Sequence, residues 1–326
     1  MGELRYSVFL HTFDQCVDRF CTQGYAPGHT LSQQFAQVRG LEGVDAVDLV
    51  LRAGIDRDAL SRELATSGLA LASVLPDLSC DPFWQHGAFT APDPAVRRRA
   101  VQTVCEGMDF AAAHGCSTVT LWPGQDGYDY LFQADYQRDY EALRDGIAAC
   151  AAHRDDVALC LEYKPCEPRT HCYLDSCAAA LALIGSLSQC NLGVAIDFGH
   201  TLMNHNAPAQ ALALCQAHGV HHLHLHLNDS FAQMDDDLMP GTAHTLYYLE
   251  FFYWLRRADY QGYLTFDLFP YREDAAGAVQ ESRRWLDALW RLAAACDPAE
   301  VEAVLCAKDG VAASRLMRRI LLPGAD

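Results

Sequence analysis

Eight short apolar runs recur along the chain, and longer amphipathic segments separate them. The runs are Tyr6–Leu10, Val44–Leu51, Leu69–Leu75, Thr118–Trp122, Val157–Glu162, Leu192–Asp197, Val220–Leu227 and Tyr263–Leu268. Strands that alternate with helices form a parallel sheet, and eight such units are enough to close a barrel. The pattern therefore predicts an α/β protein built as a single (β/α)8 TIM barrel. An open, doubly wound sheet is the alternative, because the pattern alone does not distinguish the two arrangements.

Helical periodicity is clearest in five segments between the runs, namely Pro94–His114, Asp135–His153, Leu174–Ser188, Ala207–His218 and Ala243–Ala258. Beyond the eighth run, Gly277–Ala295 and Pro298–Leu322 predict two more helices than the barrel needs. We therefore expect a barrel over residues 1–290 and a C-terminal helical extension, a candidate oligomer contact, over residues 291–326. The long, aromatic loop Pro76–Pro94 is a candidate cover for the barrel mouth.

Charge and composition narrow the classes of partner. The formal net charge of −18 disfavours nucleic acid, which proteins bind mainly through Lys and Arg, and it suits cations. The fourteen cysteines contain no C-x-x-C pair and are scattered through apolar stretches, so we expect free thiols. No apolar run approaches the roughly 20 residues that span a bilayer. These features predict a soluble cytoplasmic protein that binds neither nucleic acid nor membrane.

Ionisable residues end four consecutive strands of the predicted barrel, at matching positions: Glu162, Asp197, His226 and Asp267. The active site of such a barrel lies at the carboxyl ends of its strands. Charged groups at the ends of apolar runs are costly to desolvate unless they are paired or bind a metal. Three carboxylates and one imidazole form an oxygen-rich ligand set, which suits Mn²⁺, Mg²⁺ or Co²⁺. We therefore predict a divalent-metal site at this end of the barrel.

A second cluster lies close to these residues in the sequence. His200 follows Asp197 by three residues, and Asp235 and Asp237 come after the seventh strand. Alternate residues of an extended loop point the same way, so both aspartates are candidates to share a second cation with His200. The alternative is that the run of three aspartates is a solvated loop.

The histidines of the seventh strand are assigned by position. Period-2 alternation places His222, His224 and His226 on one face of the strand. His226 lies nearest the end of the strand and is the candidate ligand. His224 is interpreted as an interior histidine with a hydrogen-bond partner.

Several motifs resemble those of the xylose isomerase family. The most specific is Glu162–Arg169, E-Y-K-P-C-E-P-R, which is similar to that family's E-x-K-P-x-E-P-R signature. Further similar segments are Gly87–Thr90, Pro94–Arg99, Leu121–Gly127, Asp197–His200 and Phe266–Asp267. The L-rhamnose isomerases look similar too, in the H-x-N-D and D-D-D motifs at His226–Asp229 and Asp235–Asp237.

The resemblance implies a sugar isomerase that interconverts an aldose and a ketose by a hydride shift, with two divalent ions in each subunit. One ion would be held by Glu162, Asp197, His226 and Asp267. The second would be held by His200, Asp235 and Asp237, with Asp197 or Glu162 as a bridge. Glu162 and Asp267 would thereby belong to the catalytic set.

The resemblance also implies roles around the ions. Lys164 would hydrogen-bond the carbonyl oxygen of the substrate, and it is one of only two lysines, with Lys308, in a chain that otherwise uses Arg. Trp122 would wall the pocket, and Phe20 would close the site of a neighbouring subunit in a homodimer or homotetramer. Glu167 is a further candidate to contact the sugar.

One departure from the family leaves alternatives open. Xylose isomerase opens the sugar ring with a histidine at the end of strand two, and Asp45–Val50 contains none. Ring opening is left to His11, to His86 or to solvent. The alternatives are a ketose 3-epimerase or other enediol epimerase, a metal-dependent phosphodiesterase or apurinic endonuclease, and a sugar-binding barrel without catalysis.

Overall fold

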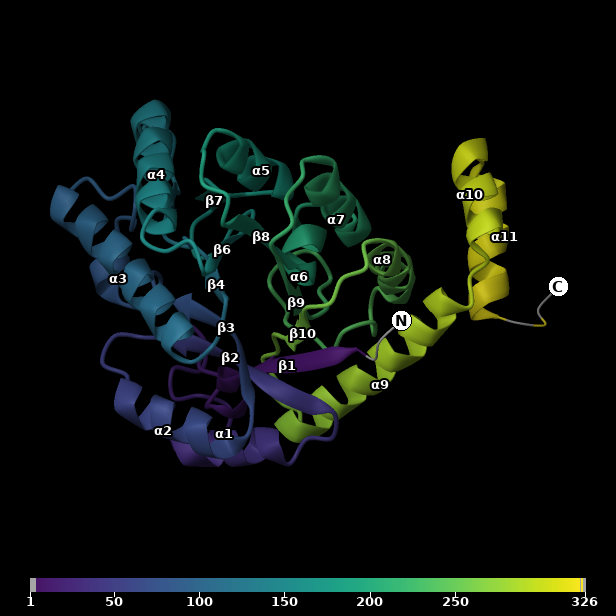
Figure 1. Cartoon of the computed structure of the whole chain (residues 1–326), viewed down its shortest axis with the longest axis horizontal. Helices are drawn as coiled ribbons and strands as arrows, with labels where there is room; N and C mark the ends of the chain where they lie inside the picture. Colours follow the sequence, from purple (N-terminus) through teal and green to yellow (C-terminus); the bar gives the residue numbers. More distant parts are fainter. Residues whose placement is uncertain (1–3, 323, 325–326) are drawn as a thin grey trace.

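Eight parallel strands close into a barrel in this computed structural model, which describes residues 4–322 and 324 (Figure 1). The hydrogen-bonded order around the barrel is β1-β10-β9-β8-β6-β4-β3-β2. Their bounds are Arg5–Phe9 (β1), Val44–Leu51 (β2), Ala70–Pro76 (β3), Thr118–Leu121 (β4), Ala158–Glu162 (β6), Leu192–Asp197 (β8), Leu223–Leu227 (β9) and Tyr263–Phe266 (β10). The predicted (β/α)8 barrel is confirmed, and closure of β1 on β10 excludes the open sheet.

Helices cover the outside of the barrel (Figure 1). They are α1 (Leu31–Arg39), α2 (Arg57–Ser67), α3 (Pro94–Ala113), α4 (Tyr136–Ala151), α5 (Cys177–Gly185), α6 (Phe198–Met203), α7 (Pro208–Ala217), α8 (Thr245–Arg257) and α9 (Ala275–Ala294). Short 3-10 turns, η1 (Leu10–Phe13) and η2 (Pro82–Trp84), lie in the loops after β1 and β3. The loop Pro76–Pro94 therefore contains a turn of its own, which the apolar pattern did not predict.

Local sequence explains where these elements begin. Every residue of β6 and of β8 is buried, as expected for parallel strands that are covered on both faces. Asp93 caps α3, whose first residue is Pro94, and Ser176 caps α5 by accepting from the backbone N–H of Ala179. Capping residues of this kind satisfy backbone donors that the helix itself leaves unpaired.

Two predicted strands are shorter by more than one residue in the structure. The seventh was expected over Val220–Leu227, but β9 begins at Leu223, and His222 is exposed below it. The eighth was expected to reach Leu268, but β10 ends at Phe266. Asp267 still donates its backbone N–H to Leu227 at 3.3 Å, so it stays at the barrel rim.

A small two-stranded sheet was missed by sequence reasoning. Strands β5 (Gly127–Tyr128) and β7 (His171–Cys172) pair antiparallel outside the barrel, although α4 and β6 lie between them in the chain. A strand of two residues shows no detectable periodicity, which explains the omission. The small sheet joins the loop after β4 to the loop after β6.

The C-terminal region differs from the prediction. The single helix expected over Pro298–Leu322 is two helices, α10 (Pro298–Ala307) and α11 (Gly310–Leu321). Lys308 adopts a positive φ of 50° and ends α10, and Asp309 caps α11. Both helices project away from the barrel beyond α9 (Figure 1). The boundary at residue 290 stays a prediction, and α9 continues across it to Ala294. Among the described residues, no helix is long and apolar enough to cross a membrane.

Candidate metal centre and active site

The four predicted strand-end ligands meet at the carboxyl end of the barrel. Glu162 ends β6, Asp197 ends β8, His226 lies one residue before the end of β9, and Asp267 directly follows β10. Parallel pairing places Asp197 opposite His226 across β8 and β9. One ligand atom from each of the four residues lies within 4.8 Å of the other three. The structure therefore brings together all four residues that the strand pattern singled out.

A second ligand group shares a member with the first. Asp197, His200 and Asp235 also offer atoms that lie within 4.8 Å of one another. Asp197 is common to both groups. Asp237, the third predicted ligand here, lies outside both groups and accepts a hydrogen bond of 2.9 Å from the amide of Asn228. Its role as a ligand stays a prediction.

The sequence D-F-G-H at Asp197–His200 explains how one residue serves both groups. Asp197 is the N-cap of α6, and its Oδ1 accepts the backbone N–H of His200 at 2.8 Å. The first turn of α6 therefore holds His200 beside the end of β8. Asn228 fixes the other side, because its amide donates to Asp197 Oδ2 at 3.1 Å and its carbonyl accepts from the N–H of Gly199. Sequence reasoning gave Asn228 no role, although it stands inside the H-x-N-D motif.

The two histidines present defined nitrogens to the carboxylates. Nδ1 of His200 lies 3.1 Å from the carbonyl oxygen of Tyr163, which can only accept, so this nitrogen carries a proton. Nε2 of His200 lies 3.0 Å from Asp235 Oδ2 and is the nitrogen that faces the second group. For His226 the facing nitrogen is Nδ1, which lies 3.0 Å from Glu162 Oε1.

Negative charge exceeds positive charge in this buried cluster. Burial raises the pKa of the Asp197 carboxyl to about 7, against the attraction of His200, and Asp235 and Glu162 add to the rise. Burial disfavours the protonated form of His200, but Asp197 and Asp235 outweigh it and raise the pKa of that imidazole to about 9. Burial also disfavours the protonated form of His226, but Glu162 outweighs it and raises the pKa of that imidazole to about 10. The cluster binds protons that a cation would replace.

The donor set fits divalent cations. The first group offers three carboxylates and one imidazole, and the second offers two carboxylates and one imidazole. Hard cations such as Mg²⁺ and Mn²⁺ prefer oxygen-rich sets of this kind. Oδ1 of Asp235 is buried and has no hydrogen-bond partner among the described residues, so a lone pair is free for an ion.

Lys164 lies at the edge of the second group. Its Nζ lies 2.7 Å from Asp235 Oδ2 and 3.3 Å from Glu167 Oε2. The ammonium also lies 5.3 Å from the centre of the Trp122 ring. Burial disfavours the charged form, but Asp235 and Glu167 outweigh it and raise the pKa of Lys164 above its usual range. Position 164 therefore presents a fixed positive charge beside the metal ligands, with Trp122 against it.

Of the three remaining candidates, only His11 reaches the cluster. Its Nε2 lies 3.3 Å from Asp267 Oδ1, and its ring packs between Phe9 and Phe269. The contact with Asp267 does not have hydrogen-bond geometry, and both ring nitrogens of His11 are buried without a partner among the described residues. Phe20 is 74% exposed, and His86 is exposed in the loop after β3.

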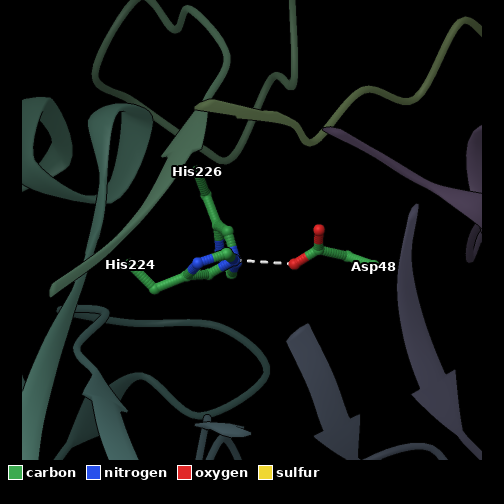
Figure 2. Close-up of side chains that lie close together, drawn as sticks. All are labelled: Asp48, His224 and His226. Atoms are coloured by element: carbon green, nitrogen blue, oxygen red, sulfur yellow. Dashed lines mark hydrogen bonds and ion pairs between the residues drawn. The ribbon is translucent and has the colours of Figure 1, made fainter. Parts of the chain in front are cut away.

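A buried pair of side chains lies below the cluster, and the sequence predicted only one of its two members. His224 has the predicted hydrogen-bond partner, and that partner is Asp48 of β2, whose Oδ2 lies 2.7 Å from Nε2 (Figure 2). Asp48 stands inside an apolar strand, and 176 residues separate it from His224. Nothing in the local pattern of either strand indicates this pairing.

Fold and residue arrangement together define a class of (β/α)8 barrel with candidate metal-ligand groups at its carboxyl end. The sequence pattern of the xylose isomerase-like TIM barrel family matches residues 35–289, and the chain belongs to that family.

Individual relatives agree with this. Xylose isomerase of Thermus thermophilus is 30% identical over 237 residues, which are 68% of this chain and 60% of that protein. Xylose isomerase of Thermus caldophilus is 30% identical over 269 residues, 77% of this chain and 67% of that protein. The chain thus spans less than two thirds of the length of the first relative. A solved structure of a D-tagatose 3-epimerase-like protein is 15% identical with a TM-score of 0.67, over 88% of this chain and 98% of that one, which shows a shared fold.

Proposed function

We propose that this protein is a divalent-metal-dependent sugar isomerase that interconverts an aldose and a ketose by a 1,2-hydride shift. The observation that carries the proposal is a pair of ligand groups that share Asp197 and lie against the ammonium of Lys164. The substrate class is supported by the two relatives, both named xylose isomerase, and by the E-x-K-P-x-E-P-R signature that contains Glu162 and Lys164.

The residues that would hold the ions are those of the two groups, with Asp237 as a further candidate. Bound divalent ions supply Lewis-acid stabilisation of the substrate oxygens and a water of lowered pKa. In the reaction, the hydrogen on C2 of the open-chain aldose moves to C1 with its electron pair. The C2 hydroxyl loses a proton and the C1 oxygen gains one, so the conversion is balanced.

Lys164 has the main role among the side chains outside the ligand groups. We assign its ammonium to the carbonyl oxygen of the sugar, where it stabilises the negative charge that develops during hydride transfer. Asp235 and Glu167 hold the ammonium in place, and the face of Trp122 excludes water from that side. Glu162, at the end of β6, and Asp267, directly after β10, complete the proposed catalytic set.

Ring opening is assigned to His11. It is the one candidate of the two that touches the cluster, through Asp267, and its ring nitrogens are without partners among the described residues. A free imidazole nitrogen is suited to accept the anomeric hydroxyl proton as a general base.

A ketose 3-epimerase is the second candidate. The fold it would use is shared with the D-tagatose 3-epimerase-like structure. An enediol mechanism needs two opposed carboxylate bases, which here would be Glu162 and Asp267. Asp267 is one methylene shorter than glutamate, and a fixed lysine beside a second ligand group has no part in that mechanism, so the isomerase is preferred.

Assembly and location are proposed from the same relationship. We expect a cytoplasmic homodimer or homotetramer, with no nucleic-acid or membrane partner. The exposure of Phe20 supports its proposed contact with the site of a neighbouring subunit.

A turnover screen in D₂O tests the proposal. The protein is stripped with chelator, Mn²⁺, Mg²⁺ or Co²⁺ is restored separately, and aldoses, ketoses and deoxysugars are followed by product NMR. Metal-dependent aldose–ketose conversion without deuterium in the product is the expected result. Conversion with solvent deuterium would identify the epimerase-type enediol instead. Metal binding without conversion of any sugar would contradict both enzymatic functions and favour a sugar-binding barrel.

A further inference from the structure

Asp48 is a buried carboxylate in the middle of the barrel, below the proposed metal centre. It is fully buried, and its carboxylate accepts hydrogen bonds from residues of three other strands. Oδ2 accepts from His224 Nε2 of β9 at 2.7 Å, and Oδ1 accepts from Ser7 of β1 and, at 3.0 Å, from Thr265 of β10. Burial alone would raise the pKa of this carboxyl, but His224 and the other hydrogen bonds outweigh it and lower the pKa. Asp48 is therefore a fixed negative charge inside the barrel.

The Asp48–His224 pair lies beside the ring of His226. His224 and His226 are alternate residues of β9, and their rings meet edge to face at 5.0 Å with an interplanar angle of 89°. One donor or acceptor atom from each of Asp48, His224 and His226 lies within 4.8 Å of the other two, and Figure 2 shows both rings converging on the carboxylate. Phe9 packs against His226 on another side at 4.9 Å.

The two nitrogens of His226 consequently lie in different surroundings. Nδ1 faces Glu162 and the metal-ligand group, at 3.0 Å from Oε1. Nε2 is buried and has no hydrogen-bond partner among the described residues. An imidazole that binds an ion through one nitrogen carries its proton on the other, and that N–H is stabilised by a nearby carboxylate. Asp48 supplies a carboxylate oxygen within 4.8 Å of a ring nitrogen of His226.

We propose that Asp48 is a positioning residue for the metal ligand His226, acting both by its charge and through the ring of His224. The negative charge of Asp48 favours the proton on Nε2 and leaves the Nδ1 lone pair for the ion. The hydrogen bond from His224 to Asp48 fixes the ring against which His226 packs. The inference rests on the proposed function, because it takes His226 as a ligand.

The same three residues do not form a further metal site of their own. Two ligand atoms on one tetrahedral ion with bonds of about 2.0–2.1 Å lie roughly 3.3 Å apart. His224 Nε2 and Asp48 Oδ2 are 2.7 Å apart, which is the distance of a hydrogen bond with a proton between them.

Manganese binding to the stripped protein tests the proposal without relying on activity. The electron paramagnetic resonance signal of free Mn²⁺ is titrated against wild type and Asp48→Asn, and both occupancy and affinity are read from the two binding steps. We expect Asp48→Asn to weaken one of the two ions about 10- to 100-fold and to leave the other unchanged, because His226 belongs to only one ligand group.

A control variant separates positioning from general stability. Asn191 is also buried, and it donates to the carbonyls of Ala151, Arg154 and Val157, away from the ligand groups. Asn191→Ala is expected to lower Tm without changing either Mn²⁺ affinity. Thr265→Val removes one hydrogen bond to Asp48 and keeps its charge, and it is expected to weaken the same ion by about threefold. This variant provides the test if Asp48→Asn does not fold.

The possible results separate this inference from the proposed function. If wild type binds two Mn²⁺ and Asp48→Asn binds both as tightly, Asp48 does not position His226 and the metal centre stands. If wild type binds no Mn²⁺, the proposed metal centre itself is wrong. If wild type binds a third equivalent of metal that Asp48→Asn loses, the three residues hold an ion and the positioning role is overturned.

Discussion

The ionisable side chains at the barrel mouth stabilise one another, several of them across different strands and loops. Glu162 lies against His226, Asp235 lies against Lys164 and His200, and Asp197 caps the helix that carries His200. Isolated buried charges would cost several kcal/mol each, and pairs with hydrogen bonds offset that cost. The metal-free site is therefore a network in which removing one charge leaves another unpaired.

Lys164→Met is expected to lower kcat of the proposed isomerase about 100-fold or more, because the developing charge on the carbonyl oxygen loses its ammonium. The measurement is kcat and KM on the best aldose of the screen, with bound metal counted for each variant. Lys308→Met is the matched control, since Lys308 is the other lysine and lies exposed at the end of α10. Full turnover by Lys164→Met would refute the role given to this residue, whereas a loss of bound metal would show that it acts on the ligands.

The stability of the metal-free protein is expected to fall between pH 7 and 10. The folded-state pKa values of His200 and His226, about 9 and about 10, lie above the ordinary value of 6.5. A raised pKa contributes stability below pH 6.5, and that contribution is lost as the pH rises through 9 and 10. We expect a loss on the order of several kcal/mol, seen by scanning calorimetry as a lower Tm at pH 10 than at pH 7.

Added Mn²⁺ is expected to reduce this loss, because the ions bind the deprotonated imidazoles and their affinity rises with pH. His200→Gln removes one of the two titrating groups and is expected to flatten the pH profile of the metal-free protein. An equally steep profile in that variant would show that other groups cause the loss.

Among the elements, the small β5–β7 sheet has the greatest bearing on the site. Its strand β7 follows the signature loop that carries Lys164 and Glu167, and the N–H of Cys172 donates to Pro165 of that loop at 3.2 Å. Arg169 adds a salt bridge of 2.6 Å to Asp129 on the β5 side. The β5–β7 sheet therefore ties the lysine loop to the loop that carries Trp122.

Gly127→Ala is expected to lower kcat/KM about tenfold while the barrel stays folded. An added Cβ at Gly127 would lie 2.0 Å from the carbonyl oxygen of His171, so the two strands must separate. Far-UV circular dichroism and steady-state kinetics check the two parts of this expectation. Gly185→Ala in α5 is the control, because its Cβ meets no atom within 4 Å and it is expected to keep full activity. Unchanged kinetics in Gly127→Ala would show that the β5–β7 sheet does not position the lysine loop.

The elements also show how far local pattern predicts structure. Runs of apolar residues identified all eight barrel strands, because parallel strands buried on both faces have a strong signal. The predicted strand bounds were wrong where buried apolar residues lie outside the sheet. Val220 is buried but lies in the loop before β9, and Leu268 is buried beyond the end of β10. Burial at these positions comes from the surrounding loops rather than from the sheet.

At the scale of the whole molecule, α10 and α11 lie at one edge of the barrel beyond α9 (Figure 1), and Glu302 of α10 lies 3.9 Å from Arg257 of α8. Helix α9 packs on α8, whereas α11 has no fully buried residue and packs chiefly on α10. Val311 and Met317 of α11 are exposed. Exposed apolar side chains on a helix at the edge of the molecule suit a contact between subunits.

Truncation after Cys296 is expected to leave the barrel folded and to reduce the assembly to monomers. Val301 is the single fully buried residue of the removed helices, so we expect Tm to fall by roughly 3 °C or less. Light scattering coupled to gel filtration measures the mass of both proteins. A truncated chain that keeps the wild-type assembly would place the subunit contact elsewhere.

The division between sequence and tertiary structure follows from the range of the interactions. Strand periodicity and the positions of Glu162, Asp197, His226 and Asp267 at strand ends are local, so the sequence by itself determined the eight alternating strand–helix units and the four residues of the main candidate ligand group. The contacts of His11 with Asp267 and of Asp48 with His224, and the separation of Asp237 from both groups, were decided by the tertiary structure. Barrel closure joins strands that are distant in the chain, and the tilt of those strands selects which side chains share a level. Neither the closure of the barrel nor the tilt of its strands is encoded in a local pattern.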